Sequence, residues 1–207
     1  MTTARCRLLF CAFLLIPALS SAQTAFVQGG YGIESRRFSR GEIAGVLDGD
    51  AGTLTAAAGA FLTSRFSASL ELDLGRSSST DDVVSIAVAG RPTTVTTTFV
   101  SRQRSAAALA GLHSSGGRRA RIGVYAGLTF ISFRREVSSD APPIVLSVPP
   151  PAAVFVDRTV SPVVGADVEV RLAPRLALVA SMRAHGIALT DVDGFRIRPA
   201  ALLRLTF

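Results

Sequence analysis

The chain has no lysine and no tryptophan, and its only two cysteines, Cys6 and Cys11, lie near the N-terminus. Both fall inside residues 1–22, a segment with the features of a secretory signal peptide. Cleavage before Gln23 would leave a mature chain, residues 23–207, without a thiol. That absence excludes a disulfide scaffold and a cysteine-ligated metal site in the mature protein.

The signal-peptide prediction depends on three features in order. Arg5 and Arg7 come first, an apolar run from Leu8 to Leu19 follows, and small residues end the segment at Ala22. An N-terminal membrane anchor is the alternative interpretation. The apolar run is shorter than the about 20 residues that a spanning helix requires, which favours a cleaved signal.

The rest of the chain has no second long apolar run and no helical periodicity beyond two turns, which excludes a helical membrane protein. The full 207-residue chain is 48% hydrophobic and only 18% charged, too apolar for a disordered chain. The formal net charge is +7, or about +5 after two arginines are removed with the signal. The arginines alternate with apolar residues and do not cluster with exposed aromatic residues, so nucleic-acid binding is not predicted.

Alternation of residue type with a period of two, interrupted by clusters of Gly, Ser, Asp and Pro, predicts β-strands. The eight expected strands are Ala25–Ser35, Gly52–Thr63, Phe66–Gly75, Thr94–His113, Arg119–Arg135, Val156–Leu172, Arg175–Ala188 and Phe195–Phe207. The predicted fold class is therefore all-β.

The connections between these strands alternate in length. Three are tight, after Leu62, His113 and Leu172, whereas the longer ones cover residues 36–50, 76–92, 136–154 and 190–194. In an up-and-down meander all long connections lie at one end, and with eight strands both chain ends lie at the other. This is the pattern of transmembrane β-barrels, which have short periplasmic turns and longer extracellular loops.

One face of each strand is apolar and free of charge. In the third strand Phe66, Leu70 and Leu74 alternate with Glu71 and Asp73. Alternation alone also fits a soluble barrel with an apolar interior. The polar face is rich in Gly, Ala and Ser, which suits the narrow lumen of eight strands, and charge on a lipid-facing side is costly. We therefore expect an eight-stranded antiparallel up-and-down transmembrane β-barrel with the apolar face outward.

The last strand, ALLRLTF, resembles the C-terminal signal by which outer-membrane barrels are recognised for assembly, with Leu203, Leu205 and Phe207 on one face. With the export signal and the loop pattern, residues 25–207 resemble the small eight-stranded outer-membrane β-barrel family typified by outer membrane protein X, the outer membrane protein A barrel and the OmpW type. The resemblance implies the outer membrane of a Gram-negative bacterium as location. The implied partners are outer-membrane lipid and lipopolysaccharide, the barrel assembly machinery, and an extracellular or host surface.

Charged residues on the inward face must pair or stay hydrated, because an isolated buried charge costs several kcal/mol. We expect a network that plugs the lumen and includes Glu71, Asp73, Asp167, Glu169, Arg102, Arg104, Arg121, Arg171, Arg183, Arg196, Arg198 and Arg204, with Glu34 also on the inward face. The alternative is a narrow pore or transporter for small or hydrophobic solutes, with an anion-attracting lumen favoured by the arginine surplus.

Two histidines raise a remote alternative, a hydrolase, because a histidine beside a serine can activate a nucleophile. The resemblance implies lipid A as the substrate, since some eight-stranded outer-membrane enzymes deacylate it. His113, near Ser115, belongs to the short-turn end, whereas His185 shares a face with Ser181 and Arg183. A hydrogen-bonded lumen histidine is the better explanation, so no catalytic residue is predicted and the protein is expected not to be an enzyme.

No cofactor or metal site is predicted, because the chain lacks nucleotide, phosphate-loop and zinc motifs. Residues 48–50 and 191–194 are acidic but lack the ligand spacing of an EF-hand, and ordinary turns explain them. The Pro-rich segment 139–156 has unusual apolar content and predicts either a lid over the barrel mouth or an adhesive patch.

Overall fold

The computed structural model describes residues 24–38, 49–88, 91–114, 119–139, 153–188 and 193–207. These residues form nine strands, which are, in chain order, β1 (Thr24–Phe38), β2 (Gly49–Phe61), β3 (Phe66–Gly75), β4 (Ser78–Val88), β5 (Arg91–His113), β6 (Ala120–Ser139), β7 (Ala153–Ala173), β8 (Leu176–Ala188) and β9 (Asp193–Thr206). No helix among them is long and apolar enough to cross a membrane.

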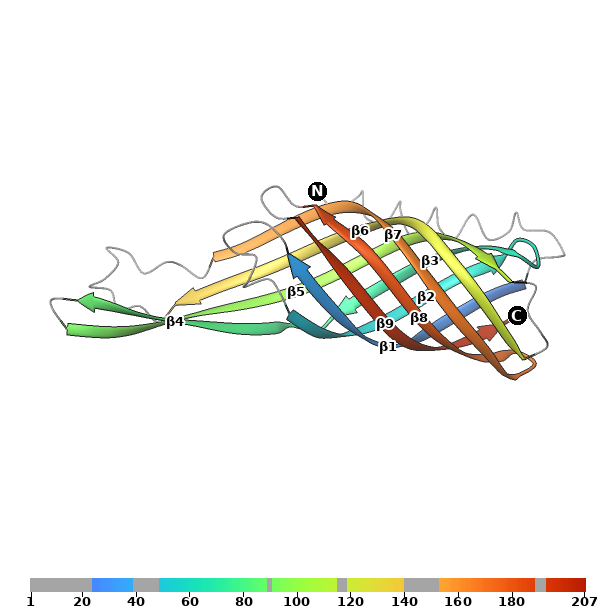
Figure 1. Cartoon of the computed structure of the whole chain (residues 1–207), viewed down its shortest axis with the longest axis horizontal. Helices are drawn as coiled ribbons and strands as arrows, with labels where there is room; N and C mark the ends of the chain where they lie inside the picture. The colour runs from blue at the N-terminus through green and yellow to red at the C-terminus, as the bar shows by residue number, and fades with distance from the viewer. Residues whose placement is uncertain (1–23, 39–48, 89–90, 115–118, 140–152, 189–192) are drawn as a thin grey trace, which may run out of the picture.

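Eight of the strands close into an antiparallel barrel with steeply tilted strands (Figure 1). Every strand pairs with its neighbour in the chain, except that β3 pairs with β5 past β4. The barrel is closed by β1 and β9, where Phe26 lies opposite Thr206. The backbone N–H of Phe207 also donates to the carbonyl oxygen of Ala25 at 2.8 Å. The prediction of an eight-stranded up-and-down barrel is confirmed.

The additional strand, β4, was not predicted, because the sequence predicted a loop over residues 76–92. It pairs with the first half of β5 from Ser78 opposite Ser101 to Val88 opposite Arg91. This hairpin extends well beyond the barrel, at the end opposite to the C-terminus (Figure 1). The segment is rich in Thr and Val, which favour strands, and these residues outweigh the Ser and Asp cluster that predicted a turn.

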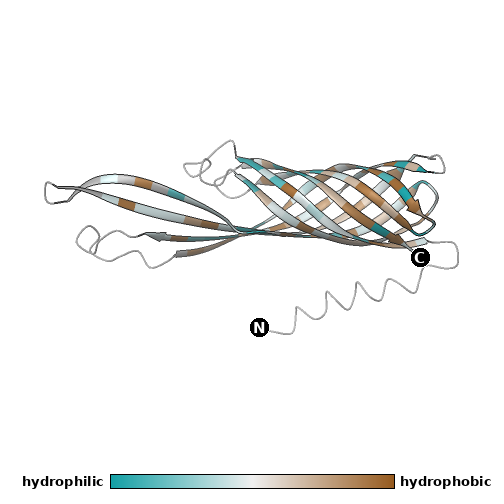
Figure 2. Cartoon of the chain, turned by 90° about the horizontal axis from the view of Figure 1, so that it is seen from below, coloured by the Kyte–Doolittle hydropathy of each residue, from teal (hydrophilic) through white to brown (hydrophobic). Residues whose placement is uncertain are grey.

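Burial decides which face of the strands points inward. Leucines on the outer face, such as Leu70, Leu72 and Leu74 of β3, are more than half exposed, whereas Glu71 and Asp73 between them are buried. Figure 2 shows the same alternation of hydrophobic and hydrophilic bands along the barrel strands. The alternative of a soluble barrel with an apolar interior is therefore wrong.

The outer face carries an apolar belt whose height matches a bilayer. On β6 it runs from Ile122 to Phe130, nine residues with every second side chain facing outward. This agrees with the about 9–11 tilted residues with which a transmembrane strand spans the hydrocarbon. The outward residue at the centre of this run is Ala126.

A charge placed at the centre of the apolar belt should destabilise the barrel, and the same charge above the belt should have little effect. We expect Ala126→Arg to lower the free energy of unfolding by about 2–4 kcal/mol in lipid vesicles, and Val154→Arg, on the outer face above the belt, by about 0–1 kcal/mol. Urea unfolding followed by gel mobility measures both. Equal losses at the two positions would contradict a lipid-facing belt.

Candidate functional site

The lumen holds a set of buried charges that balances among the described residues. Five carboxylates and five arginines there are at most 8% exposed: Glu34, Glu71, Asp73, Asp167, Glu169, Arg36, Arg183, Arg196, Arg198 and Arg204. Burial of this many charges is tolerated only when each one has opposite charge and hydrogen-bond partners close by.

The ten side chains form a continuous ion-pair ladder in which acid and base alternate. Its order, from the end near the chain termini to the end near the β4–β5 hairpin, is Glu169, Arg204, Asp167, Arg183, Glu71, Arg198, Asp73, Arg196, Glu34 and Arg36. We refer to it below as the ladder.

At the end of the ladder near the chain termini, which we call the lower end, Arg204 of β9 connects two carboxylates of β7. Its Nη1 lies 2.5 Å from Glu169 Oε2 and its Nη2 lies 3.3 Å from Asp167 Oδ2, while its Nε donates to Gln28 at 2.8 Å. The guanidinium also lies 4.6 Å from the ring centroid of Phe26, within the range of a cation–π contact. The Arg204 guanidinium is therefore positioned by two carboxylates, one amide oxygen and one aromatic ring.

In the middle of the ladder, Arg198 pairs with both Glu71 and Asp73. The distance from Arg198 Nη2 to Glu71 Oε1 is 2.5 Å. Asp73 also accepts hydrogen bonds from Thr55 and Ser105, each at 2.9 Å. These hydroxyls satisfy the remaining lone pairs of the carboxylate, which a buried ion pair requires.

At the upper end, Arg196 joins Asp73 at 3.3 Å to Glu34 at 3.2 Å. Arg36 ends the ladder, 3.6 Å from Glu34, and donates a 2.9 Å hydrogen bond to Ser78, where the β4–β5 hairpin begins. His185 also contacts Arg196, with 2.7 Å between Nε2 and Nη2. The ladder therefore extends to the end of the barrel from which the β4–β5 hairpin projects.

The ladder crosses the lumen as well as running along it. Arg183 lies on β8 and Glu71 on β3, which are four strands apart in the eight-stranded barrel and therefore on opposite walls. Their side chains meet at 3.4 Å. Gly165 leaves room for this arginine, because a Cβ added there would lie 2.6 Å from Arg183 Cδ. Side chains of this size fill the interior of an eight-stranded barrel.

The structure brings eight of the twelve predicted network residues together in the ladder: Glu71, Asp73, Asp167, Glu169, Arg183, Arg196, Arg198 and Arg204. Sequence reasoning placed Glu34 on the inward face but did not include Arg36. The signal for Arg36 is its position two residues after Glu34, on the same face of β1. Gln28, Thr55 and Ser105 were also missed, because uncharged polar residues do not mark a face as clearly.

Arg102 and Arg104 lie elsewhere and correct the prediction. Both are exposed on the outer face of the barrel, while Gln103 and Ser105 between them point inward and are buried. The alternation of β5 is hard to assign from sequence because alanines occupy both faces just beyond Ser105. Arg102 and Arg104 therefore add no positive charge to the lumen.

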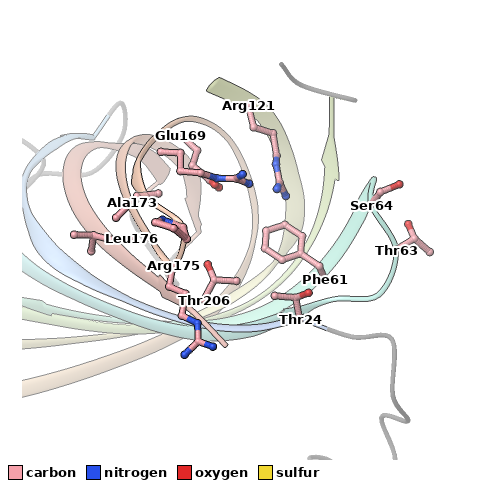
Figure 3. Close-up of a pocket in the computed structure, with 13 residues that line it drawn as sticks. Thr24, Phe61, Thr63, Ser64, Arg121, Glu169, Ala173, Arg175, Leu176 and Thr206 are labelled. Carbon is pink, nitrogen blue, oxygen red and sulfur yellow. The ribbon is translucent and has the colours of Figure 1, made fainter. Parts of the chain in front are cut away.

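Arg121 and Arg171 face a pocket of about 410 Å³ at the short-turn mouth of the barrel (Figure 3). The Arg121 guanidinium lies 4.5 Å from the ring centroid of Phe61. Arg175 also lines this pocket, and Glu169 is the one side-chain carboxylate among the described residues that line it. These arginines make a basic mouth below the ladder and have no ion pair with its carboxylates among the described residues.

Among the described residues, neither histidine belongs to a hydrogen-bonded chain of serine, histidine and carboxylate. Ser115 lies outside the described residues, and His113 instead makes a 2.7 Å hydrogen bond with Ser67. Tyr125 packs edge-on against His113 at 5.5 Å between ring centroids. Nothing in the described part of the chain places a carboxylate in hydrogen-bond contact with His113, and His185 contacts Arg196.

Several other predictions fall on residues that the structure does not describe. These are the signal peptide over residues 1–22, most of the Pro-rich segment, Asp48 of the first acidic segment, and residues 191–192 of the second. In the described ranges, no group of three or more His, Cys, Asp or Glu side chains could hold a metal ion.

No protein-family model matches the chain, and no curated protein matches it. Solved structures do. The chain is similar to Neisserial surface protein A, with a TM-score of 0.58 at 13% identity over 88% of this chain and 97% of that one. It is similar to the outer membrane protein OprG from Pseudomonas aeruginosa, with a TM-score of 0.53 at 10% identity over 90% and 96%.

A third similar structure is Ail, the attachment invasion locus protein of Yersinia pestis, with a TM-score of 0.51 at 12% identity over 89% of this chain and 100% of that one. The predicted outer-membrane location agrees with these neighbours. At such low identity the likeness concerns the fold. Together with the closed barrel and its apolar exterior, it shows that this chain has the fold of the small eight-stranded outer-membrane β-barrels.

Proposed function

We propose that this protein is a non-enzymatic outer-membrane barrel of a Gram-negative bacterium that presents a surface for interaction and does not conduct solutes. The observation that carries this proposal is the ladder. Five arginines and five carboxylates alternate along the lumen and connect its opposite walls. A paired and packed interior gives a rigid platform and leaves no continuous water path.

The β4–β5 hairpin supports the interaction role. It projects beyond the barrel at the end away from the C-terminus, which is the outside of the cell in this topology (Figure 1). Among the described residues β4 pairs only with β5, so its other edge presents backbone N–H and C=O groups. An edge of this kind can add a strand from a partner chain. The name of the similar protein Ail also refers to attachment.

The hairpin can be tested by shortening it. Replacing residues 79–100 by a two-residue turn should leave the barrel folded, because β3 already pairs with β5 below the hairpin. Attachment of expressing bacteria to cultured host cells should fall to the level of cells without the protein. Arg175→Ala, at the opposite end of the barrel, is the control. Unchanged attachment at equal surface amounts would contradict the proposed role of the hairpin.

A narrow passage for small or hydrophobic solutes is the second candidate function. The basic pocket at the barrel mouth favours it, because Arg121, Arg171 and Arg175 would attract anions there. The balanced charge of the ladder directly above this pocket weighs against conduction. The measurement that separates the two functions is given at the end of the Discussion.

A further inference from the structure

The outer face of β5, β6 and β7 changes abruptly from apolar to cationic. Its uppermost apolar row is Ala106, Phe130 and Val160, which lie opposite one another across the three strands. The next outward row is Arg104, Ser132 and Arg158. One step further, Arg102 lies directly opposite Arg134. All four arginines are exposed.

This arginine patch, defined as Arg102, Arg104, Arg134 and Arg158, is unfavourable by itself. Like charges directly opposite each other in a sheet repel and destabilise it. In the described ranges one carboxylate offsets them, Glu136, which lies 2.8 Å from Arg134. Arg104 and Arg158 have no carboxylate partner there. An external anion would remove this repulsion.

The position of the patch identifies the kind of anion. It lies directly above the apolar belt, at the end of the barrel away from the chain termini, and thus at the headgroup level of the outer leaflet. A shallow outer groove of about 590 Å³ includes Arg104 together with Leu72, Leu74 and Phe130. A ligand there would place charge against the guanidinium and hydrocarbon against the leucines.

We propose that the arginine patch binds the phosphorylated headgroup of an outer-leaflet glycolipid, lipopolysaccharide, with an acyl chain on the apolar surface below Arg104. Arginine forms bidentate, charge-assisted hydrogen bonds with phosphate. The two adjacent rows of the patch place several guanidinium groups where one phosphorylated headgroup can contact them. A free phosphate ion would use the arginines but not the apolar groove, so the lipid is the occupant that fits both.

The test uses the full-length protein refolded in neutral detergent and titrated with purified lipopolysaccharide. The variant is Arg104→Gln with Arg158→Gln, and the matched control is Arg65→Gln with Arg119→Gln, two exposed arginines at the other end of the barrel that do not line the basic pocket. We expect binding to weaken roughly tenfold or more in the variant, the size of losing a hydrogen bond to a charged group, and to stay unchanged in the control.

Two further measurements keep the result unambiguous. A variant with Arg104→Lys and Arg158→Lys retains the charges and should bind better than the Gln variant, and heat-modifiable gel mobility reports whether each variant is folded. Dephosphorylated lipopolysaccharide should bind the native protein as weakly as intact lipopolysaccharide binds the Gln variant. Equal binding by native, Gln and control proteins would overturn the proposal. So would inorganic phosphate, or a soluble sulfated polysaccharide, competing as strongly as the lipid.

Discussion

Replacing Arg198 with alanine is expected to lower the free energy of unfolding by about 3–5 kcal/mol, the cost of removing one partner from a buried ion pair. Arg198 is fully buried and pairs with both Glu71 and Asp73. Its loss would leave Glu71 with only the longer, 3.4 Å contact to Arg183. Urea unfolding in lipid vesicles, followed by gel mobility, measures the change.

Two variants show whether this loss comes from uncompensated charge. Arg198→Met combined with Glu71→Met removes a base and an acid together, and should recover a large part of the stability because no additional carboxylate is left without its partner. Arg175→Ala removes an exposed arginine and should change stability by no more than about 0.5 kcal/mol. If Arg198→Ala were as mild as Arg175→Ala, the ladder would not stabilise the barrel.

Removal of Phe207 is expected to prevent most of the protein from reaching the outer membrane while hardly changing the stability of the refolded barrel. The Phe207 side chain is 67% exposed, so little packing is lost with it. Its backbone N–H donates to Ala25, one hydrogen bond worth about 1 kcal/mol. The proposed role of Phe207, with Leu203 and Leu205, is recognition by the barrel assembly machinery.

The experiment compares full-length and truncated chains in a Gram-negative host and after refolding in detergent. Membrane fractionation reports assembly, and urea unfolding reports stability. Phe207→Tyr, which keeps an aromatic terminal residue, is the matched control and should assemble normally. Normal assembly of the truncated chain would contradict the assembly role, whereas a large loss of stability in the refolded protein would show a structural role instead.

The barrel itself could be predicted because two independent patterns agree. Alternation in Phe66–Gly75 predicts a strand with the bounds of β3, and connection length predicts which end carries the long loops. The inward position of Glu71, Asp73, Asp167 and Glu169 follows from the same alternation. Their pairing does not, because Arg183 and Glu71 meet across the lumen from strands that are far apart in sequence.

The positions of Arg102 and Arg104 could not be read from the sequence for a related reason. Only the pairing of β5 with its neighbours fixes which side of the strand faces lipid, and alanines at 106, 107, 108 and 110 suit either face. The β4 strand was missed because its stability depends on pairing with β5 outside the barrel, while its Ser and Asp residues are typical of turns.

The central claim is that the ladder closes the lumen, and planar-bilayer recording of the purified full-length protein tests it most directly. The lumen charges are paired and balanced among the described residues, and we predict no steady open-channel current across the bilayer. A steady anion-selective current through the native barrel would contradict the claim and would favour transport as the function.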